Sequence, residues 1–513
     1  MTANGTGING VNGAAPAQAH QAYQYSKEPL GNPRPIRIVV IGCGVSGIAA
    51  VKMFKDRFHN LPVELALYER NKSVGEPGSR TVTQGNPYFS RVYVGAPELY
   101  EYFKGRADAY GVPDYVRLEH KVTDVSWNEK MGQYGLKIED LATGKTITDH
   151  AEVVINSTGI LNAWKWPDIP GIHTFKGTLL HSANYDTSAD LDGKVIATFI
   201  TPELALDLAP KGRDTVYSRE EQDKWAEDPE EFLKFRKRAT HILNTGFEVI
   251  VKDSKEQKET LAMIKKQMEK RLSKKKELIP KLIPDFALGC RRFTPGDGYL
   301  EALCEDNVTV RITDIKEIVP DGVITSDGEK VELDALICAT GFNTGYLGVS
   351  VAKFPNYFMT TGPAAPAAHG TFIPCIEAYI KYAFDAVERL MREGIKSICV
   401  KEEAVADFQE HKDNIVHDFV WTSTCRSWYK NGTVDGKVWG PWPGSGPHFL
   451  ESLAHPRWED YDFKYRTGNR FQYLGNGRTI RELEGGDLSW FIKKGPKHTR
   501  EELTPSTVSI NGL

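Results

Sequence analysis

One stretch near the start of the chain constrains the fold more than any other. Residues 36–41 are mostly β-branched and apolar, which is typical of a strand buried on both faces. The G-x-G-x-x-G motif of Gly42, Gly44 and Gly47 follows at once, and the apolar residues after it recur at helical spacing. A second apolar run at 63–68 predicts another strand. This order predicts a parallel strand–helix–strand unit and therefore an α/β fold.

The glycines of this unit and one acidic residue predict that it binds a dinucleotide. Gly42 permits a tight turn, Gly44 lets the backbone approach a pyrophosphate, and Gly47 lets the helix pack closely on the strand. The N-terminus of the helix offers free N–H groups and the positive end of its dipole. Glu69 lies 22 residues after Gly47, where its carboxylate can accept hydrogen bonds from both ribose hydroxyls. A doubly wound domain that merely uses tight turns would not explain Glu69.

The bulk composition is that of an ordinary globular chain. Of its 513 residues, 40% are hydrophobic and 26% are charged, and the length predicts about three domains. The net charge of −4 gives no reason to expect a nucleic-acid partner. No run approaches the roughly 18 apolar residues of a membrane span, and the N-terminus lacks the pattern of a signal peptide. We therefore expect a cytoplasmic protein without stable membrane insertion, whose oligomeric state the sequence leaves open.

The cysteines are odd in number and scattered, and they show no metal-ligand spacing, so we predict no metal site. We interpret them as buried, reduced thiols of an intracellular protein. The seven are Cys43, Cys290, Cys304, Cys338, Cys375, Cys399 and Cys425.

The rest of the chain divides by composition. Residues 1–34 are rich in Gly, Ala, Asn, Gln and Pro and predict a disordered arm. Residues 213–287 are rich in charge and helix formers, and 257–282 predicts a long basic helix with a solvated face. Helices are also predicted at 98–110 and 374–392, a hairpin at 122–127 and 134–138, and strands at 152–156, 195–200, 308–312, 322–326 and 333–338.

Two of the predicted strands end in the same way. Residues 156–159 (Asn-Ser-Thr-Gly) and 338–341 (Cys-Ala-Thr-Gly) each follow an apolar run, about 180 residues apart. Each ending puts small residues at a point where the backbone must pass close to another group. Downstream of a dinucleotide-binding motif, the pair suggests a flavoprotein with two nucleotide-binding domains, in which the endings are the crossings between domains.

A longer motif between these endings resembles the fingerprint of type I Baeyer–Villiger monooxygenases, F-x-G-x-x-x-H-x-x-x-W followed by Pro or Asp. Phe175, Gly177, His181 and Asp186 match the fingerprint, and Tyr185 stands where the family has Trp. The resemblance extends from about residue 36 to 465. Four further segments are similar to the family: 158–171, 290–299, 354–358 and 425–429.

The resemblance implies two Rossmann-like dinucleotide-binding domains, the second truncated, with an inserted helical subdomain. The implied boundaries are an arm at 1–34, an FAD domain at 35–160 and 345–480, an NADP-type domain at 161–212 and 288–344, a helical subdomain at 213–287 and a tail at 481–513.

The implied chemistry is the NADPH- and O2-dependent conversion of a ketone to an ester or lactone on bound FAD. Gly42, Gly44, Gly47 and Glu69 are predicted to bind FAD. Segments 290–299 and 425–429 resemble fungal members that oxidise polyketide ketones in mycotoxin pathways.

Three further residues take their predicted roles from the resemblance alone. Val122 matches the family position whose backbone meets the adenine. His181 and Tyr185 belong to the inter-domain linker that couples NADPH binding to flavin chemistry, and they are the catalytic candidates.

Two departures from the family affect the cofactor sites. After Glu69 the family has V-G-G-T-W, Y-P-G and an acid near the flavin, which are absent between 73 and 93. After Lys194 the family has a second G-x-G-x-x-G, preceded by an Arg. Residues 195–202 contain no glycine, and the Arg has no counterpart. A βα unit needs about a dozen residues of crossover before its next strand, and none fits here.

These departures leave several alternatives open. Either the chain is a true variant with an impaired nicotinamide site, or the sequence has lost two pieces. A nitrogen- or sulfur-oxidising flavin monooxygenase and a non-redox binding protein or isomerase on the same scaffold also remain open.

Overall fold

A computed structural model of the chain describes most residues between Tyr23 and Lys493. The described residues are 23–75, 85–91, 94–159, 166–167, 169–181, 186, 188–198, 205–206, 216–291, 294–295, 298–338, 347–366, 370–430 and 432–493.

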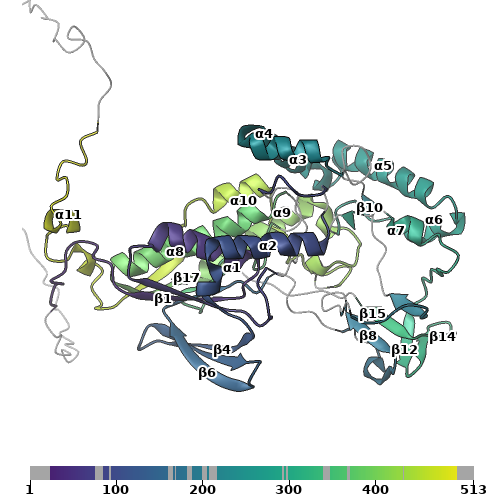
Figure 1. Ribbon diagram of the computed structural model, residues 1–513, viewed down its shortest axis with the longest axis horizontal. Coiled ribbons are helices and arrows are strands. Elements are labelled where there is room, and N and C mark those ends of the chain that lie inside the picture. The colour runs from purple at the N-terminus through teal and green to yellow at the C-terminus, as the bar shows by residue number, and fades with distance from the viewer. Residues whose placement is uncertain are drawn as a thin grey trace, which may run out of the picture.

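The centre of the larger part is a five-stranded sheet with the order β16-β7-β1-β2-β3, in which every pairing is parallel. Helices cover one face and a three-stranded antiparallel sheet, β4-β5-β6, covers the other (Figure 1). The parallel strands are β1 (Ile36–Ile41), β2 (Val63–Tyr68), β3 (Val116–Arg117), β7 (Val153–Asn156) and β16 (Tyr357–Met359). The antiparallel strands are β4 (His120–Asn128), β5 (Gln133–Asp140) and β6 (Lys145–Ala151). The α/β fold and the hairpin predicted from the sequence are thereby confirmed.

Burial on both faces explains the apolar run of β1. Ile38 and Val40 face the helices, whereas Val39 faces the antiparallel sheet, and all three are fully buried. Side chains alternate between the faces of a strand, so a strand covered on both sides has no polar positions. The covering helices are α1 (Val45–Phe58), α2 (Ala96–Tyr110) and α8 (Ile373–Arg392). These helices confirm the three helices predicted here.

A second, smaller sheet lies at the end of the molecule away from the five-stranded sheet (Figure 1). It has the parallel order β8-β15-β9, beside an antiparallel meander, β12-β13-β14. The bounds are β8 (Thr178–His181), β9 (Ile196–Thr198), β15 (Ala335–Cys338), β12 (Ile315–Val319), β13 (Gly322–Thr325) and β14 (Lys330–Glu332). Two short strands, β10 (Ala205–Leu206) and β11 (Thr294–Pro295), pair in parallel. The domain boundaries derived from the resemblance stay a prediction.

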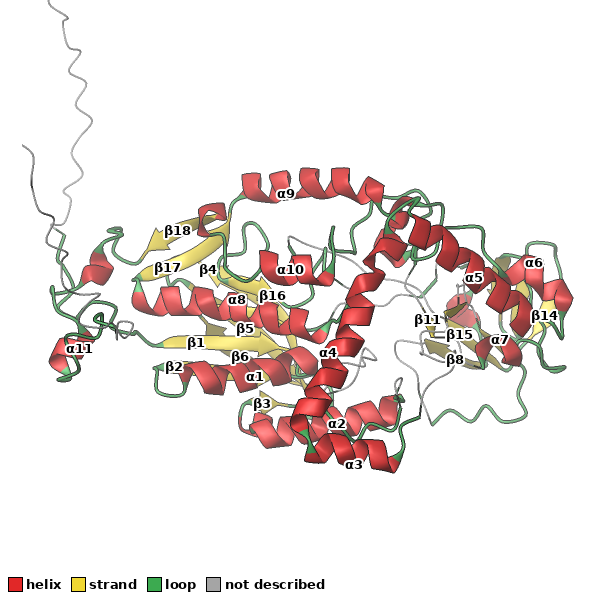
Figure 2. Cartoon of the chain, turned by 90° about the horizontal axis from the view of Figure 1, so that it is seen from above, coloured by secondary structure: helices red, strands yellow, loops and turns green. Residues whose placement is uncertain are grey.

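The charged segment folds into several helices. They are α3 (Arg219–Glu227), α4 (Pro229–Thr245), α5 (Lys255–Arg271), α6 (Ile279–Leu282) and α7 (Tyr299–Ala302), with α5–α7 at the same end as β8 and β15 (Figure 2). The predicted continuous helix at 257–282 is wrong, because α5 ends at Arg271. Leu278 and Leu282 turn back to pack in one cluster with Met268, and Pro280 is tolerated only because it lies in the first turn of α6.

The predicted strand at 308–312 is also wrong, since β12 begins at Ile315. Lys275 Nζ donates to the Val308 carbonyl (3.0 Å), so this backbone is held by the end of the helical segment rather than by a neighbouring strand. Val310 packs against the helical cluster, and Ile312 is 64% exposed. An alternating pattern without a partner strand does not form a ladder.

The C-terminal part contains β17 (Ile395–Val400) and β18 (Tyr461–Tyr465), which pair antiparallel, and the helices α9 (Glu402–Ile415), α10 (Gly446–Ser452) and α11 (Ile480–Leu483). Part of the predicted arm is ordered against it, because Leu30 N–H donates to Arg478 O (2.7 Å). Arg34 donates to the carbonyls of Leu390 and Ile395. No helix of the described ranges combines the length and the apolar composition of a membrane span.

The interpretation of all seven cysteines as reduced thiols is wrong for two of them. Cys290 and Cys425 form a disulfide, with their Cα atoms 6.3 Å apart. Cys43, Cys304, Cys338 and Cys375 are buried free thiols, and Cys399 is a partly buried one. Within the described part of the chain, no cluster of three metal-ligating side chains occurs.

An ion pair and a hydrogen bond connect the antiparallel sheet to two interior strands of the parallel sheet, β1 and β2. The Asp149 carboxylate accepts from Arg37 Nη2 (2.7 Å) and from the Tyr68 hydroxyl (2.7 Å). Burial by itself would raise the pKa of Asp149, but the hydrogen bonds from Arg37 and Tyr68 outweigh it and hold the pKa below its usual value.

We expect Asp149→Asn to lower the free energy of unfolding at pH 7 by about 1.5–3 kcal/mol, the typical contribution of a hydrogen bond to a charged group. A depressed carboxyl pKa stabilises the fold fully above the unfolded-state value of about 3.9 and progressively less as the pH falls through the folded-state value. The free energies of unfolding of the two proteins, measured by urea titration between pH 7 and 3, should therefore begin to converge below about pH 4. A difference that stays constant over this range would contradict the assignment.

Candidate dinucleotide-binding site

The predicted glycine loop joins β1 to α1 and is tightly packed at both ends. Gly42 has a φ of +101°, and a Cβ there would lie 2.6 Å from Ser157 O at the end of β7. A Cβ on Gly47 would lie 2.5 Å from Gly42 O, so the helix can approach the strand only with glycine. Both positions therefore require glycine for the turn itself.

Gly44 differs, because a Cβ built on it would have no atom of the described residues within 4 Å, apart from its chain neighbours and the backbone of its own helix. It is the N-cap of α1, and no side chain caps this helix end. The first described backbone hydrogen bond of the helix runs from Ile48 N–H to Gly44 O (3.0 Å). Open space beside uncapped N–H groups at a helix N-terminus fits a pyrophosphate.

Glu69 is 8% exposed and is anchored to the glycine loop. One carboxylate oxygen accepts from Cys43 N–H (2.7 Å) and the other from Asn71 N–H (2.9 Å). A carboxylate has about four acceptor positions, so two remain for the hydroxyls of a ribose. The Glu69–Cys43 hydrogen bond was not predicted, because the sequence contains no signal for a contact 26 residues apart.

Cys43 lies in the loop but does not offer a reactive thiol. Its side chain is fully buried in the core, and burial, with a smaller contribution from Glu69, raises its pKa to about 12. The thiol therefore stays protonated near neutral pH and is a poor nucleophile.

Val122 lies on the strand next to Glu69. Its strand β4 begins at His120, whose N–H donates to the Glu69 carbonyl (2.8 Å). Val122 pairs with Ile138 of β5 and is half-buried against the antiparallel sheet's core. This places the predicted adenine position near the predicted ribose position.

The first Thr-Gly crossing follows β7 beside the glycine loop. Asn156 Oδ1 accepts from Thr158 N–H (3.1 Å) and from the Thr158 hydroxyl (2.8 Å), while its Nδ2 donates to the Tyr357 hydroxyl (2.9 Å). Ser157 is buried, and the Thr360 hydroxyl donates to its hydroxyl (3.2 Å). The Thr-Gly ending that both strands share predicts a crossing, but it does not predict these hydrogen-bond partners.

The structure tests the linker residues only in part. His181 ends β8, is 2% exposed and lies opposite Cys338 at the end of β15. Its ring stands edge-on to Trp166, with 5.5 Å between the centroids. Tyr185 and residues 339–341 of the second crossing lie outside the described residues. The catalytic roles of His181 and Tyr185 therefore stay predictions.

The second nucleotide-binding unit is short. β9 ends at Thr198 and β10 begins at Ala205, which leaves six residues between them. A parallel strand–helix–strand crossover needs a dozen or more. β9 and β10 pair in different sheets and the residues between them lie outside the described residues, so the truncation of this unit stays a prediction.

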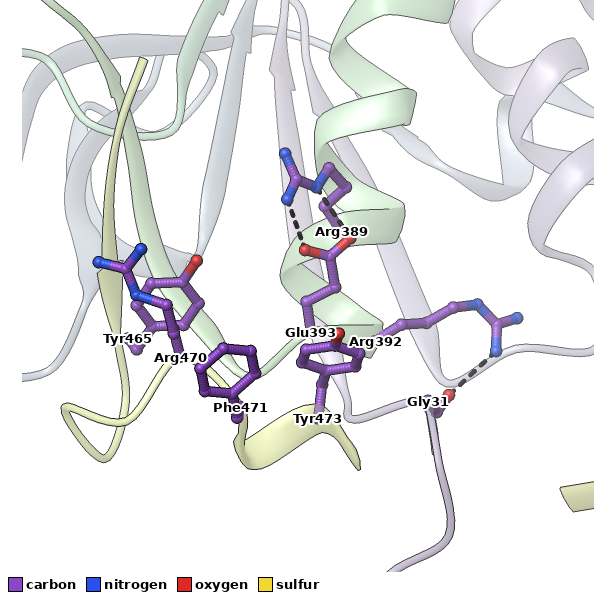
Figure 3. A pocket seen from close by; sticks show the side chains of 8 residues that line it. All are labelled: Gly31, Arg389, Arg392, Glu393, Tyr465, Arg470, Phe471 and Tyr473. Atoms are coloured by element: carbon purple, nitrogen blue, oxygen red, sulfur yellow. Dashed lines mark hydrogen bonds and ion pairs between the residues drawn. The ribbon is translucent and has the colours of Figure 1, made fainter. Parts of the chain in front are cut away.

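A cavity of about 460 Å³ lies elsewhere, near the start of β1 and the C-terminal end of α8 (Figure 3). It is separate from the glycine loop, which follows the other end of β1. Its lining residues are Gly31, Arg389, Arg392, Glu393, Tyr465, Arg470, Phe471 and Tyr473.

Comparison with known proteins agrees with this geometry. Residues 87–356 match the family model described as flavin-binding monooxygenase-like. The FAD-binding monooxygenase tazF of Aspergillus terreus is 33% identical over 542 positions, which include 90% of this chain and 96% of tazF. A Baeyer–Villiger monooxygenase of Streptomyces coelicolor is 26% identical, over 81% of this chain and 90% of that protein. The crystal structure of cyclohexanone monooxygenase from Rhodococcus sp. Phi1 bound to NADP+ shares the fold, with a TM-score of 0.69, 22% identity and coverage of 84% of this chain and 100% of that one.

The length of the tazF comparison bears on the missing segments. Because 90% of 513 residues is about 462, about 80 of the 542 compared positions have no residue of this chain. That these positions are the two stretches absent from the sequence stays a prediction. The family model covers more than half of the chain and the tazF similarity covers nearly all of it, so the chain belongs to the flavin-binding monooxygenase-like family.

Proposed function

We propose that the protein is an FAD-dependent monooxygenase that uses NADPH and O2 to insert oxygen next to a ketone, giving an ester or lactone. The observation that carries the proposal is the open space at Gly44 beside the uncapped N-terminus of α1, with Glu69 anchored next to it. The names of the relatives, which include Baeyer–Villiger and cyclohexanone monooxygenases, support the reaction class and a ketone substrate. A polyketide-type substrate fits the resemblance of segments 290–299 and 425–429 to fungal members.

The chain's own residues would bind and orient the cofactor. The N–H groups at the start of α1 hold the FAD pyrophosphate beside Gly44, and the free acceptor positions of Glu69 bind the ribose. The backbone of Val122 would contact the adenine. The bound flavin would supply the redox and oxygen chemistry.

The linker residues would connect the two nucleotide sites. His181 is held between β15 and Trp166 at the end of the smaller sheet. We propose that His181 and Tyr185 transmit NADPH binding to the flavin site, as their match to the fingerprint suggests.

A second candidate function is a flavin-binding protein that NADPH does not reduce. The sequence of residues 195–202 favours it, because it contains no glycine and is too short for a second glycine loop and its helix. Such a protein would bind FAD structurally and act as a binding protein or isomerase.

Anaerobic titration of the purified full-length protein separates the two candidates. A monooxygenase is expected to carry yellow flavin and to lose the flavin absorbance on anaerobic addition of NADPH. In a separate aerobic assay it is expected to consume O2 with NADPH and a panel of ketones. Flavin that dithionite bleaches but NADPH does not would establish the second candidate. Protein that takes up no FAD during refolding or dialysis would contradict both.

A further inference from the structure

The exposed apolar side chains of the protein are concentrated in two segments near the N- and C-terminal ends of the chain. Of the 22 large apolar side chains exposed in the described part of the chain, 11 belong to residues 23–30 and 471–492. Single exposed apolar residues are ordinary, whereas a concentration of them marks an interaction surface. The 11 are Tyr23, Tyr25, Leu30, Phe471, Tyr473, Leu474, Leu483, Leu488, Trp490, Phe491 and Ile492.

These two segments form one structural unit, which we call the terminal lobe (residues 23–34 and 466–493). Leu30 N–H donates to Arg478 O (2.7 Å), and Asn476 N–H donates to Glu28 O (2.9 Å). Figure 1 shows α11 of the lobe standing apart from the helices and sheets of the body. The exposed side chains therefore gather at one end of the molecule.

The most exposed part of the lobe combines aromatic, aliphatic and basic residues. Trp490, Phe491 and Ile492 are 61%, 64% and 72% exposed, and Lys493 follows them. Over its described residues the lobe carries seven basic and four acidic side chains, a net charge of +3. Two of the acidic side chains already have partners, since Glu482 caps α11 and Asp487 accepts from Ser489. Aromatic residues next to basic ones are typical of segments that lie at a membrane–water interface.

The cavity contributes guanidinium groups to the same end (Figure 3). Arg389 is paired with Glu393, and Arg392 uses one N–H on Gly31 O (3.1 Å) while it also complements the C-terminal end of α8. Arg470 makes no hydrogen bond or ion pair with the described part of the chain, and it lies next to Phe471, which is 60% exposed. Arginine is the preferred side chain for phosphate, because its planar donors match phosphate oxygens.

We propose that the terminal lobe docks the protein on an anionic phospholipid surface, with Trp490, Phe491 and Ile492 at headgroup depth and Arg392 and Arg470 on lipid phosphates. The net positive charge of the lobe selects this partner, since a second copy would bring the same cations together. This is peripheral binding and needs no spanning helix. It is independent of the proposed reaction.

Sedimentation of the full-length protein with vesicles tests the proposal. We expect strong binding to phosphatidylcholine vesicles that contain phosphatidylserine, and at least tenfold weaker binding to phosphatidylcholine alone, because each cation near the surface strengthens binding by about fivefold. Binding should weaken in high salt. The triple variant Trp490→Ala/Phe491→Ala/Ile492→Ala and the single variant Arg470→Ala should each reduce it. Ile312→Ala is the matched control, because Ile312 is 64% exposed outside the lobe.

Two results would overturn the proposal. Equal binding of the triple variant and the unmodified protein would show that the lobe is not the contact. The lobe would instead be a self-association surface if light scattering showed that the unmodified protein is a dimer, that the triple variant is a monomer, and that neither binds vesicles. Both readouts are independent of flavin content, so failure of the proposed reaction would not affect them.

Discussion

Gly44→Ala is expected to weaken FAD binding by at least about tenfold while leaving the fold intact. Gly44 has a φ of −76°, a negative value that alanine can adopt, and its Cβ would meet no atom of the described residues within 4 Å beyond its chain neighbours and its own helix. The added methyl group would instead occupy the space where a pyrophosphate approaches the N-terminus of α1. Loss of one charge-assisted hydrogen bond to that phosphate costs about 1.5–3 kcal/mol, which is at least tenfold in affinity.

Gly42→Ala is the contrasting variant and is expected to damage both folding and FAD binding. Its φ of +101° is strained for alanine by about 1–3 kcal/mol, and the Cβ would collide with Ser157 O at 2.6 Å. Gly193→Ala is the control for a left-handed turn away from the site, since Gly193 has φ +68° and an open Cβ position. Gly193→Ala should lower the free energy of unfolding and leave the flavin content unchanged.

Flavin content and thermal melting of the three variants, prepared in parallel, distinguish these effects. Gly44→Ala should melt near the temperature of the unmodified apoprotein but retain little flavin after dilution. Full retention of flavin by Gly44→Ala would refute the assignment of this loop as the pyrophosphate site, whatever the melting temperatures are.

The sequence predicts the first nucleotide-binding unit well because its signals are local. Residues 36–69 contain a strand, a glycine loop, a helix and an acid in immediate succession, and each pattern is readable within a few residues. The hydrogen bond from Cys43 N–H to Glu69 and the packing of Gly42 against Ser157 depend on the assembled sheet, so no local pattern contains them.

The two wrong secondary-structure predictions have the same origin. The basic segment 257–282 has helical propensity throughout, but Leu278 and Leu282 gain more by folding back onto Met268 than by extending the helix into solvent. Residues 308–312 alternate like a strand, yet Lys275 already occupies the carbonyl of Val308. In both places a contact between distant residues outweighs local preference.

Loss of the Cys290–Cys425 disulfide is expected to have the largest effect on stability of any single change. The bond closes a loop of 135 residues. The chain-entropy relation gives about 5 kcal/mol for a loop of this length, towards the upper end of the usual range. Cys290 lies just after Ala287, which packs in the same cluster as Trp421 and Tyr429 on either side of Cys425, so the bond joins two distant segments that share a core. A pairing of cysteines so far apart has no signal in one sequence, since the spacing of seven cysteines fits many connectivities.

Urea unfolding of the unmodified protein, with and without dithiothreitol, should therefore show a large loss of stability on reduction. Both sulfurs are buried, so reduction should need prior opening and be slow in the native protein. The double variant Cys290→Ser/Cys425→Ser should resemble the reduced protein and be insensitive to dithiothreitol, whereas Cys304→Ser, which removes a buried free thiol, should keep the full response to reductant. Thiol titration of the denatured protein gives an independent count, with five reactive thiols before reduction and seven after it. Seven thiols before reduction would mean that the two sulfurs are close but unbonded, and the stability difference should then vanish as well, because no covalent loop would constrain the unfolded chain.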